Sequence, residues 1–278
     1  MLMGLSKVTL IIPTHNRHGY LARILEYYRD VAMQMVVVDS SSQPFTQENT
    51  KIPLQYYHLP GMPMPQKMKF ALERVETPFV VFCSDDDFVL PQGIQTCVDF
   101  LQSHPQYASA QGNSITYKKR KRYSDFIEIN PLYDEVSRDI SMNDPFERLQ
   151  FLFSSYRTVF SAVHYSEVMN LAYADIDPGI SNLFLNEYIT SIVPIVAGKH
   201  KELPVFYQLR EYAEDSGDKV TENLDVVYRS SSYADELSLF LDYVAQKISV
   251  ITGLPVIQSK NNLNLMLRSF SEQLEKQK

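Results

Sequence analysis

Residues 79–91 read FVVFCSDDDFVLP, an apolar run followed at once by three adjacent carboxylates. An apolar run without polar alternation is typical of a strand that is buried on both faces of a sheet. Asp85, Asp86 and Asp87 would then lie where this strand leaves the core, and Pro91 would begin the next helix. Adjacent carboxylates repel one another, so we expect a cation beside them.

Three earlier segments repeat the pattern of an apolar run that ends in polar residues. They are KVTLII at 7–12, which we expect Pro13 to close, MQMVVVDSSS at 33–42, whose strand ends at Asp39, and LQYYHL at 54–59. An amphipathic helix is predicted at 20–30, between the first two segments, and another at 66–76, between the third segment and residue 79. A further helix is predicted after Pro91. Uniformly apolar strands that alternate with helices predict an α/β fold, with a mostly parallel sheet flanked by helices on both faces.

Ligands of such sheets bind outside the carboxyl ends of the strands. The segment THNR at 14–17, Asp39 and the triplet 85–87 all fall at strand ends. We therefore expect three distant segments to converge on one crevice.

The second half of the chain has a looser pattern. YASAQGNSITYKK at 107–119 is predicted to be a strand that continues into a hairpin, and Asp144 is a predicted N-cap of a helix. SNLFLNEYITSIVPIVAG at 181–198 is predicted to be a helix that is interrupted near Pro194 and ended by Gly198. Two further helices, at 233–251 and 261–274, predict a C-terminal helical appendage.

Composition indicates an ordinary globular protein, with 278 residues, 45% of them hydrophobic. A net charge of −7 argues against a general nucleic-acid binder. The basic run KKRKR at 118–122 is typical of a solvated loop or hairpin flank, with contact to an anionic acceptor or a membrane surface as the alternative. Cys83 and Cys97 make no disulfide framework and no segment approaches about 20 apolar residues, so we expect a cytoplasmic protein without a transmembrane helix.

The triplet has two interpretations. Mg²⁺ and Mn²⁺ prefer carboxylate oxygens, and Mg²⁺ takes only one or two of them from the protein. In a strand Asp85 and Asp87 would share one face, whereas in a turn any adjacent pair could converge, so the register stays open. The alternative is a turn and helix N-cap ahead of Pro91. Three aspartates in a row at a predicted crevice favour the cation.

Taken together, VTLIIPTHNR at 8–17, VVVDSSS at 36–42 and FVVFCSDDDFVLP at 79–91 resemble the start of an inverting glycosyltransferase of the GT-A fold, family 2, with its Asp-x-Asp motif. The resemblance covers residues 7 to about 113. It implies transfer of a hexose-type sugar from a nucleotide diphosphate sugar, with a UDP-sugar favoured, to a hydroxyl acceptor in glycan or polysaccharide synthesis. It also implies a domain at 1–220, divided into a nucleotide-sugar half at about 1–113 and an acceptor half at about 114–220, with the helical appendage at 221–278.

The resemblance also implies roles for individual residues. Asp39 would accept a hydrogen bond from the base, Asp85 would face the ribose, and Asp86 would bind the Mn²⁺ or Mg²⁺ that bridges the diphosphate. Asp87 would be a second ligand or a supporting group. The residues expected to line the nucleotide-sugar pocket are Pro13, Thr14, Asn16 and Arg17.

The sequence departs from the family pattern at three places. Ser84 stands where many relatives have an acidic residue, and Asp39 is followed by three serines. Where relatives often carry Ala-Arg-Asn, this chain reads PQKMKFALE, so Lys67 or Lys69 would supply a positive group near the diphosphate.

Transfer with inversion needs a base that takes the proton of the acceptor hydroxyl. Glu187, at the start of a predicted helix, is the best match to the family position, and Asp175 and Asp177 are its competitors. In GKHKELPVFYQLRE at 198–211, we expect Arg210 or His200 to meet the diphosphate, with an exposed loop position as the alternative for His200.

Two other classes of protein compete with a transferase. A noncatalytic nucleotide-sugar or glycan-binding subunit would keep the fold but lose turnover. A sugar nucleotidyltransferase would need a Gly-rich phosphate loop after the first strand, and PTHNRHGY at 13–20 lacks one. Expected partners are a nucleotide-sugar donor and a glycan or lipid-linked acceptor, and no nucleic acid. Peripheral membrane contact and pairing with a second chain are left open.

Overall fold

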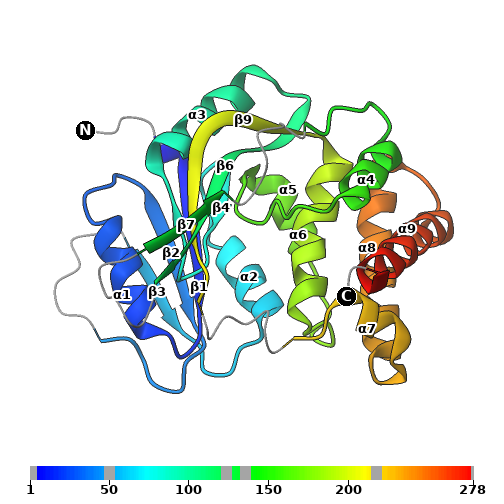
Figure 1. Ribbon diagram of the computed structural model, residues 1–278, viewed down its shortest axis with the longest axis horizontal. Helices are drawn as coiled ribbons and strands as arrows, with labels where there is room; N and C mark the ends of the chain where they lie inside the picture. The colour runs from blue at the N-terminus through cyan, green and yellow to red at the C-terminus, as the bar shows by residue number, and fades with distance from the viewer. Residues whose placement is uncertain (1–4, 47–53, 120–126, 132–138, 214–220, 277–278) are drawn as a thin grey trace.

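A computed structural model describes residues 5–46, 54–119, 127–131, 139–213 and 221–276 of the chain. A twisted sheet lies between helices on its two faces, and the C-terminal helices gather at one end of the molecule (Figure 1). The first half of the sheet is parallel, as predicted. Its strands, in the spatial order β3-β2-β1-β4, are β3 Leu54–His58, β2 Gln34–Asp39, β1 Val8–Thr14 and β4 Phe79–Phe82.

Strand β1 does not end at Pro13, contrary to the prediction. It continues to Thr14, with Pro13 opposite Val38 of β2. On the other side, Cys83 N donates to Ile11 O, and the next donor toward β4 would be the nitrogen of Pro13, which carries no hydrogen. The proline therefore ends the pairing between β1 and β4 rather than the strand, and the chain after Phe82 separates from the sheet.

The second half of the sheet is mixed. Strand β8 (Val163–Tyr165) runs antiparallel to both β4 and β6 (Tyr107–Lys119), and β9 (Lys199–Glu211) runs parallel to β6. The predicted hairpin is present, because β7 (Ile127–Pro131) pairs antiparallel with β6. The two-residue strand β5 (Phe88–Val89), directly after the acidic triplet, pairs antiparallel with β9. This pairing brings the end of β9 beside the triplet.

Both faces of the sheet are covered, which explains the apolar runs. Leu10 and Ile12 face one hydrophobic cluster with α1 and α3, whereas Ile11 and Val36 face a second cluster with α2, α5 and α6. The helices of these layers are α1 His18–Tyr27, α2 Met64–Leu72, α3 Pro91–Ser103, α4 Pro145–Ser154, α5 Ser166–Tyr173 and α6 Leu183–Ala197. Asp144 caps α4 as predicted, accepting hydrogen bonds from the backbone of Phe146 and Glu147.

The predicted interruption of the helix near Pro194 is wrong. Helix α6 continues through Pro194 to Ala197, and Gly198 follows it as predicted. The proline lies in the last turn, where it removes the hydrogen bond to the carbonyl four residues earlier and brings its ring close to that carbonyl. Its ring is buried in the helical layer, so packing of α6 against its neighbours offsets this loss.

The chain after residue 221 is helical, as predicted. It forms α7 Leu224–Arg229, α8 Ala234–Thr252 and α9 Val256–Lys276. Phe240, Val244, Leu263 and Leu267 are buried in the same cluster as α6. The proposed boundary at 220 stays a prediction. Among the described residues no single helix is long and apolar enough to cross a membrane, although the bent pair 231–252 and 256–276 meets the length and composition test when taken together.

Candidate active site

The acidic triplet lies in a turn between β4 and β5. Asp87 N donates to Ser84 O over 3.1 Å, and all three aspartates are buried. Because a turn lets adjacent side chains diverge, each carboxylate has different neighbours. Asp86 and Asp87 line a cavity of about 460 Å³, and Asp85 contacts the end of β1.

Arg17 is the cation nearest to the first two carboxylates. Its Nη1 donates to Asp85 Oδ1 over 2.6 Å and its Nη2 donates to Asp86 Oδ2 over 2.8 Å. Thr14 Oγ1 donates to the other oxygen of Asp85 over 2.6 Å. Burial raises the pKa of Asp85 to about 6, although the charge of Arg17 and the Thr14 hydrogen bond lower it.

Asp87 turns the other way, toward β9. Glu211 N donates to its Oδ1 over 3.0 Å, Gln208 Nε2 donates to its Oδ2 over 3.1 Å, and Arg210 Nε lies 3.7 Å from Oδ2. Burial raises the pKa of Asp87 to about 7, against the lowering effect of Arg210. The sequence predicted Arg210 near this site but not Gln208. Gln208 and Arg210 are two positions apart on one strand, so their side chains point to the same face of the sheet. This spacing could have indicated Gln208 from the sequence.

Lys67 lies at the same crevice. It is buried, and its Nζ donates to Thr14 O over 3.0 Å. Burial lowers the pKa of Lys67 to about 8, while the charges of Asp85 and Asp39 raise it. Lys69 lies two positions further along α2, about 200° around the helix from Lys67. Of the two candidate lysines, the structure therefore brings Lys67 to the triplet.

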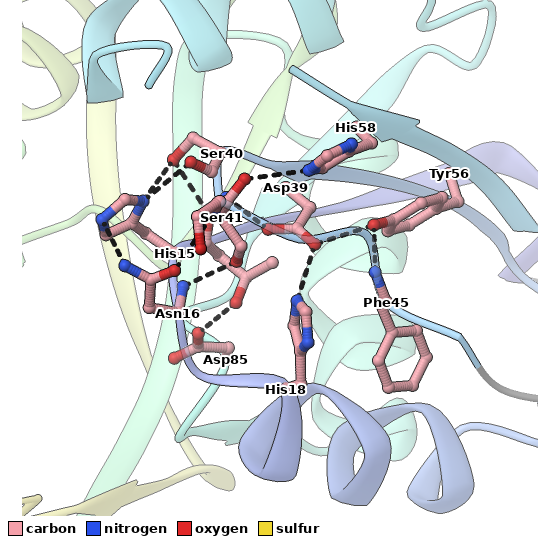
Figure 2. Close-up of polar contacts among 12 residues, drawn as sticks. His15, Asn16, His18, Asp39, Ser40, Ser41, Phe45, Tyr56, His58 and Asp85 are labelled. Atoms are coloured by element: carbon pink, nitrogen blue, oxygen red, sulfur yellow. Dashed lines mark hydrogen bonds and ion pairs between the residues drawn. The ribbon is translucent and has the colours of Figure 1, made fainter. Parts of the chain in front are cut away.

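Asp39, at the end of β2, is fully buried in a polar network (Figure 2). Its Oδ1 accepts from Ser41 N over 2.8 Å, and its Oδ2 lies 2.7 Å from Tyr56 Oη and 2.9 Å from His18 Nε2. Burial raises the pKa of Asp39, but the hydrogen bonds from Ser41, Tyr56 and His18 outweigh it and leave the pKa lowered. A nucleobase reaches this carboxylate only if one of the covering side chains moves, so its role toward the base stays a prediction.

The loop after β1 is tied to the end of β2. Asn16 has a φ of 55°, and its backbone N donates to Ser41 Oγ over 2.6 Å. His15 Nδ1 lies 3.0 Å from Ser40 O (Figure 2). Together with the contacts of Thr14 and Arg17 to the triplet, these bonds confirm that the three predicted segments converge. That they form one ligand crevice stays a prediction.

Glu187 lies on the same cavity as Asp86, although 101 positions separate them in the chain. It is on the second turn of α6, and Tyr156 Oη donates to its Oε1 over 2.8 Å. No pattern in the sequence indicated a role for Tyr156. The competing acids Asp175 and Asp177 occupy a turn: Asp175 has a φ of 57°, and Asp177 Oδ1 accepts from Gly179 N over 2.7 Å.

His200, which was considered from the sequence, is buried in the sheet together with His164. His200 Nδ1 lies 2.8 Å from Ser109 Oγ, and His164 Nε2 lies 2.8 Å from Val159 O. An exposed loop position for His200 is therefore wrong. The strand pairing of β9 with β6 places this residue inside the sheet.

Comparison with protein families matches residues 9–162, more than half of the chain, to the description "Glycosyl transferase family 2". The chain belongs to glycosyl transferase family 2. It is accordingly a glycosyltransferase by family, with the α/β sheet flanked by helices and the C-terminal helices described above. No curated protein sequence matches the chain.

Solved structures give the same fold for this family 2 chain. The TarS 1–349 fragment of S. aureus in complex with UDP-GlcNAc aligns with a TM-score of 0.56 at 16% identity, covering 95% of this chain and 71% of that one. A longer S. aureus TarS structure aligns with a TM-score of 0.51 at 15% identity, covering 87% of this chain and 43% of that one. At these identities the likeness shows a GT-A fold.

The carboxylates of this family 2 site fit a divalent cation that is held by few protein ligands. Asp86 lines the cavity and accepts from Arg17 through Oδ2, while both oxygens of Asp87 already accept hydrogen bonds from β9. Among the described residues no three His, Cys, Asp or Glu side chains converge on one point. Mg²⁺ commonly binds one or two carboxylates together with phosphate oxygens and water, and this donor set meets that requirement.

Proposed function

We propose that the chain transfers a sugar, with inversion, from a nucleoside diphosphate sugar to a hydroxyl group of a glycan or lipid-linked acceptor. The observation that carries this proposal is the shared cavity, which Asp86 and Asp87 line together with Glu187. The carboxylate pair after β4 would serve the leaving diphosphate. The separate carboxylate on α6 would serve the attacking hydroxyl. A UDP-sugar is the favoured donor, since the structural neighbour TarS was solved with UDP-GlcNAc.

The donor would be held by the crevice at the ends of β1, β2 and β4. Its walls would be the predicted pocket residues Pro13, Thr14, Asn16, Arg17, Asp39 and Asp85, of which Arg17 lines the cavity with Asp86 and Asp87. Arg17, Lys67 and Arg210 place positive charge around the acidic triplet, where a diphosphate would lie. Lys69 is the weaker of the two lysine candidates because it lies on another face of α2.

Asp86 would hold Mn²⁺ or Mg²⁺, with Asp87 as a second ligand or support. When bound, such an ion neutralises the charge that grows on the diphosphate as the glycosidic bond breaks, and so stabilises the transition state more than the ground state. Gln208 and the backbone of Glu211 fix the carboxylate of Asp87, which in turn limits how far the triplet can move.

Glu187 would act as the general base. As the acceptor oxygen attacks the anomeric carbon from the side opposite the diphosphate, its proton passes to a carboxylate oxygen of Glu187. The Tyr156 hydroxyl donates to Oε1 of Glu187 and so holds this carboxylate at the cavity. We place the reaction in glycan or polysaccharide synthesis. A cytoplasmic location is part of the proposal and is supported by two cysteines, Cys83 and Cys97, that are both free.

The proposal is tested by nucleotide release from common UDP-, GDP- and dTDP-sugars with Mn²⁺, using the full chain and Glu187→Gln as the matched variant. We expect release from at least one donor, and a Glu187→Gln variant that binds this donor with wild-type affinity but transfers at least about 100-fold more slowly. Metal-dependent donor binding by the wild type without any release would instead favour a noncatalytic nucleotide-sugar-binding subunit. Loss of donor binding in Glu187→Gln would contradict the role of Glu187 as base.

A further inference from the structure

The cavity around Glu187 has an apolar wall that differs in character from the acidic end. Phe184 and Tyr188 flank Glu187 on α6, Tyr156 comes from the segment after α4, and Phe270 and Leu274 come from α9. Figure 1 shows α9 lying beside α4 and α8, at the end of the molecule opposite α1. Of these five apolar residues only Tyr156 lies within the matched family segment 9–162. The wall is therefore a feature of this chain's C-terminal half.

The rings of this wall hold one another in place. Tyr156 and Phe270 have ring centroids 5.6 Å apart, and Tyr156 and Tyr188 have centroids 5.2 Å apart with planes at 73°. Phe270 is almost fully buried, whereas Tyr156, Phe184 and Leu274 keep part of their surface in the cavity. Buried aromatic contacts of this kind fix the orientation of the partly exposed side chains.

The chemistry of the wall limits what can occupy it. A cavity of about 460 Å³ falls in the range of small-molecule sites and is too small for a protein surface. One side is apolar and aromatic, while Glu187, Asn186 and Asn223 offer polar atoms at its edge. A pyranose or furanose ring has this character, because its C–H face is apolar and its rim carries hydroxyl groups.

We propose that α9 completes an acceptor subsite, in which Leu274, Phe184 and Tyr156 receive the C–H face of a cyclic sugar and present one of its hydroxyl groups to Glu187. The acceptor is thus a saccharide ring rather than an open-chain alcohol. The role of Glu187 in this inference rests on the proposed function, but binding of the ring does not.

The subsite is tested by saturation-transfer-difference NMR on the full chain, with a panel of methyl glycosides of glucose, galactose, mannose and N-acetylglucosamine. We expect at least one glycoside to receive saturation on its ring C–H protons. Leu274→Asp should weaken this signal at least about tenfold, since it removes an apolar contact and places a charge against the ring. Leu265→Asp is the matched control, because Leu265 lies on the same helix, is 68% exposed and does not line the cavity.

Three results would overturn the subsite: no saturation of any glycoside by the wild type, equal saturation of the open-chain alcohol glycerol, or equal signals from the Leu274 and Leu265 variants. If thermal denaturation shows that Leu274→Asp does not fold, Phe184→Ala takes its place, with the same expected loss. A protein that binds a glycoside through this wall but releases no nucleotide from any donor would contradict the proposed transfer while leaving the subsite intact.

Discussion

The guanidinium of Arg17 bridges two adjacent carboxylates, with Nη1 2.6 Å from Asp85 and Nη2 2.8 Å from Asp86. The positive charge that the acidic triplet requires is thus supplied in part by the chain itself, from the loop directly after β1. A divalent cation on Asp86 would therefore share this carboxylate with Arg17. If the proposed cation binds to Asp86, Arg17 links the stability of the triplet to the binding of that cation.

Replacing Arg17 by Gln should destabilise the chain by about 2–4 kcal/mol, because two buried carboxylates lose their shared partner. Mn²⁺ should then raise the melting temperature of Arg17→Gln by more than it raises that of the wild type. Thermal denaturation with and without Mn²⁺ measures both effects. Arg29→Gln is the control, since the Arg29 side chain is 54% exposed and pairs with Glu26 one turn away on the protein surface. Equal Mn²⁺ responses of wild type and Arg17→Gln would contradict a cation site at the triplet.

Asp86→Asn should lower the rate of sugar transfer at least about 100-fold, the usual cost of one group that stabilises developing charge. The free energy of unfolding should change by less than about 1 kcal/mol, because Arg17 keeps its hydrogen bond to Asp85 and the repulsion between neighbouring aspartates falls. Nucleotide release and thermal denaturation of the same preparation check the two statements. A variant with full activity would assign the cation to a different carboxylate.

The sequence predicted the crevice because the geometry of a parallel sheet leaves few alternatives. Strands buried on both faces must be apolar throughout, and their carboxyl ends lie along one edge, so Thr14, Asp39 and Asp85 had to come close. What each carboxylate contacts was not predictable. Whether Asp87 turns toward β1 or β9 depends on the turn at 84–87 and on the pairing of β5 with β9, and neither leaves a periodic signal in the sequence.

The apolar wall was also not predictable from the sequence, because its residues lie far apart in the chain. Leu274 follows Glu187 by 87 positions, and the helical spacing of α9 shows only that one face is apolar, not which surface this face meets. Pro194 misled the prediction for a related reason. The local cost of a proline in a helix is known, but the packing that offsets it comes from the neighbouring helices α4, α5 and α8, which the local sequence does not reveal.

Lys67 and Lys69 provide a matched pair of substitutions on one helix. Lys67→Met should weaken donor binding about tenfold or more, because it removes a buried positive charge that lies beside Asp85 and Asp39, whereas Lys69→Met should leave donor binding unchanged. The KM for the donor in a nucleotide-release assay, or titration calorimetry with UDP and Mn²⁺, gives the comparison. The reverse order of effects would place the diphosphate on a different face of α2.

Two histidines buried in the sheet should each contribute a loss of stability in mild acid. Burial lowers the pKa of His164 to about 4 and that of His200 to about 3, and His164 further lowers the pKa of His200. Both side chains are neutral in the folded state and each leaves one ring nitrogen without a hydrogen-bond partner within the described residues: His164 Nδ1 and His200 Nε2. In the unfolded chain a histidine takes up its proton near pH 6.5.

Below pH 6.5 these two histidines take up protons in the unfolded state but not in the folded state, so their contribution to stability falls as the pH falls from 6.5 toward 4. The raised pKa values of Asp85 and Asp87 act in the opposite direction over the same range. Each histidine contributes a slope of up to about 1.4 kcal/mol per pH unit in this window. His164→Gln keeps a side-chain N–H donor for Val159 O but does not titrate, so its free energy of unfolding should lose about half of the histidine-dependent slope. Denaturant unfolding measured from pH 4 to 8 checks this, and the curves of wild type and variant should run parallel above pH 6.5. Equal slopes below pH 6.5 would mean that His164 gains its proton without leaving the sheet.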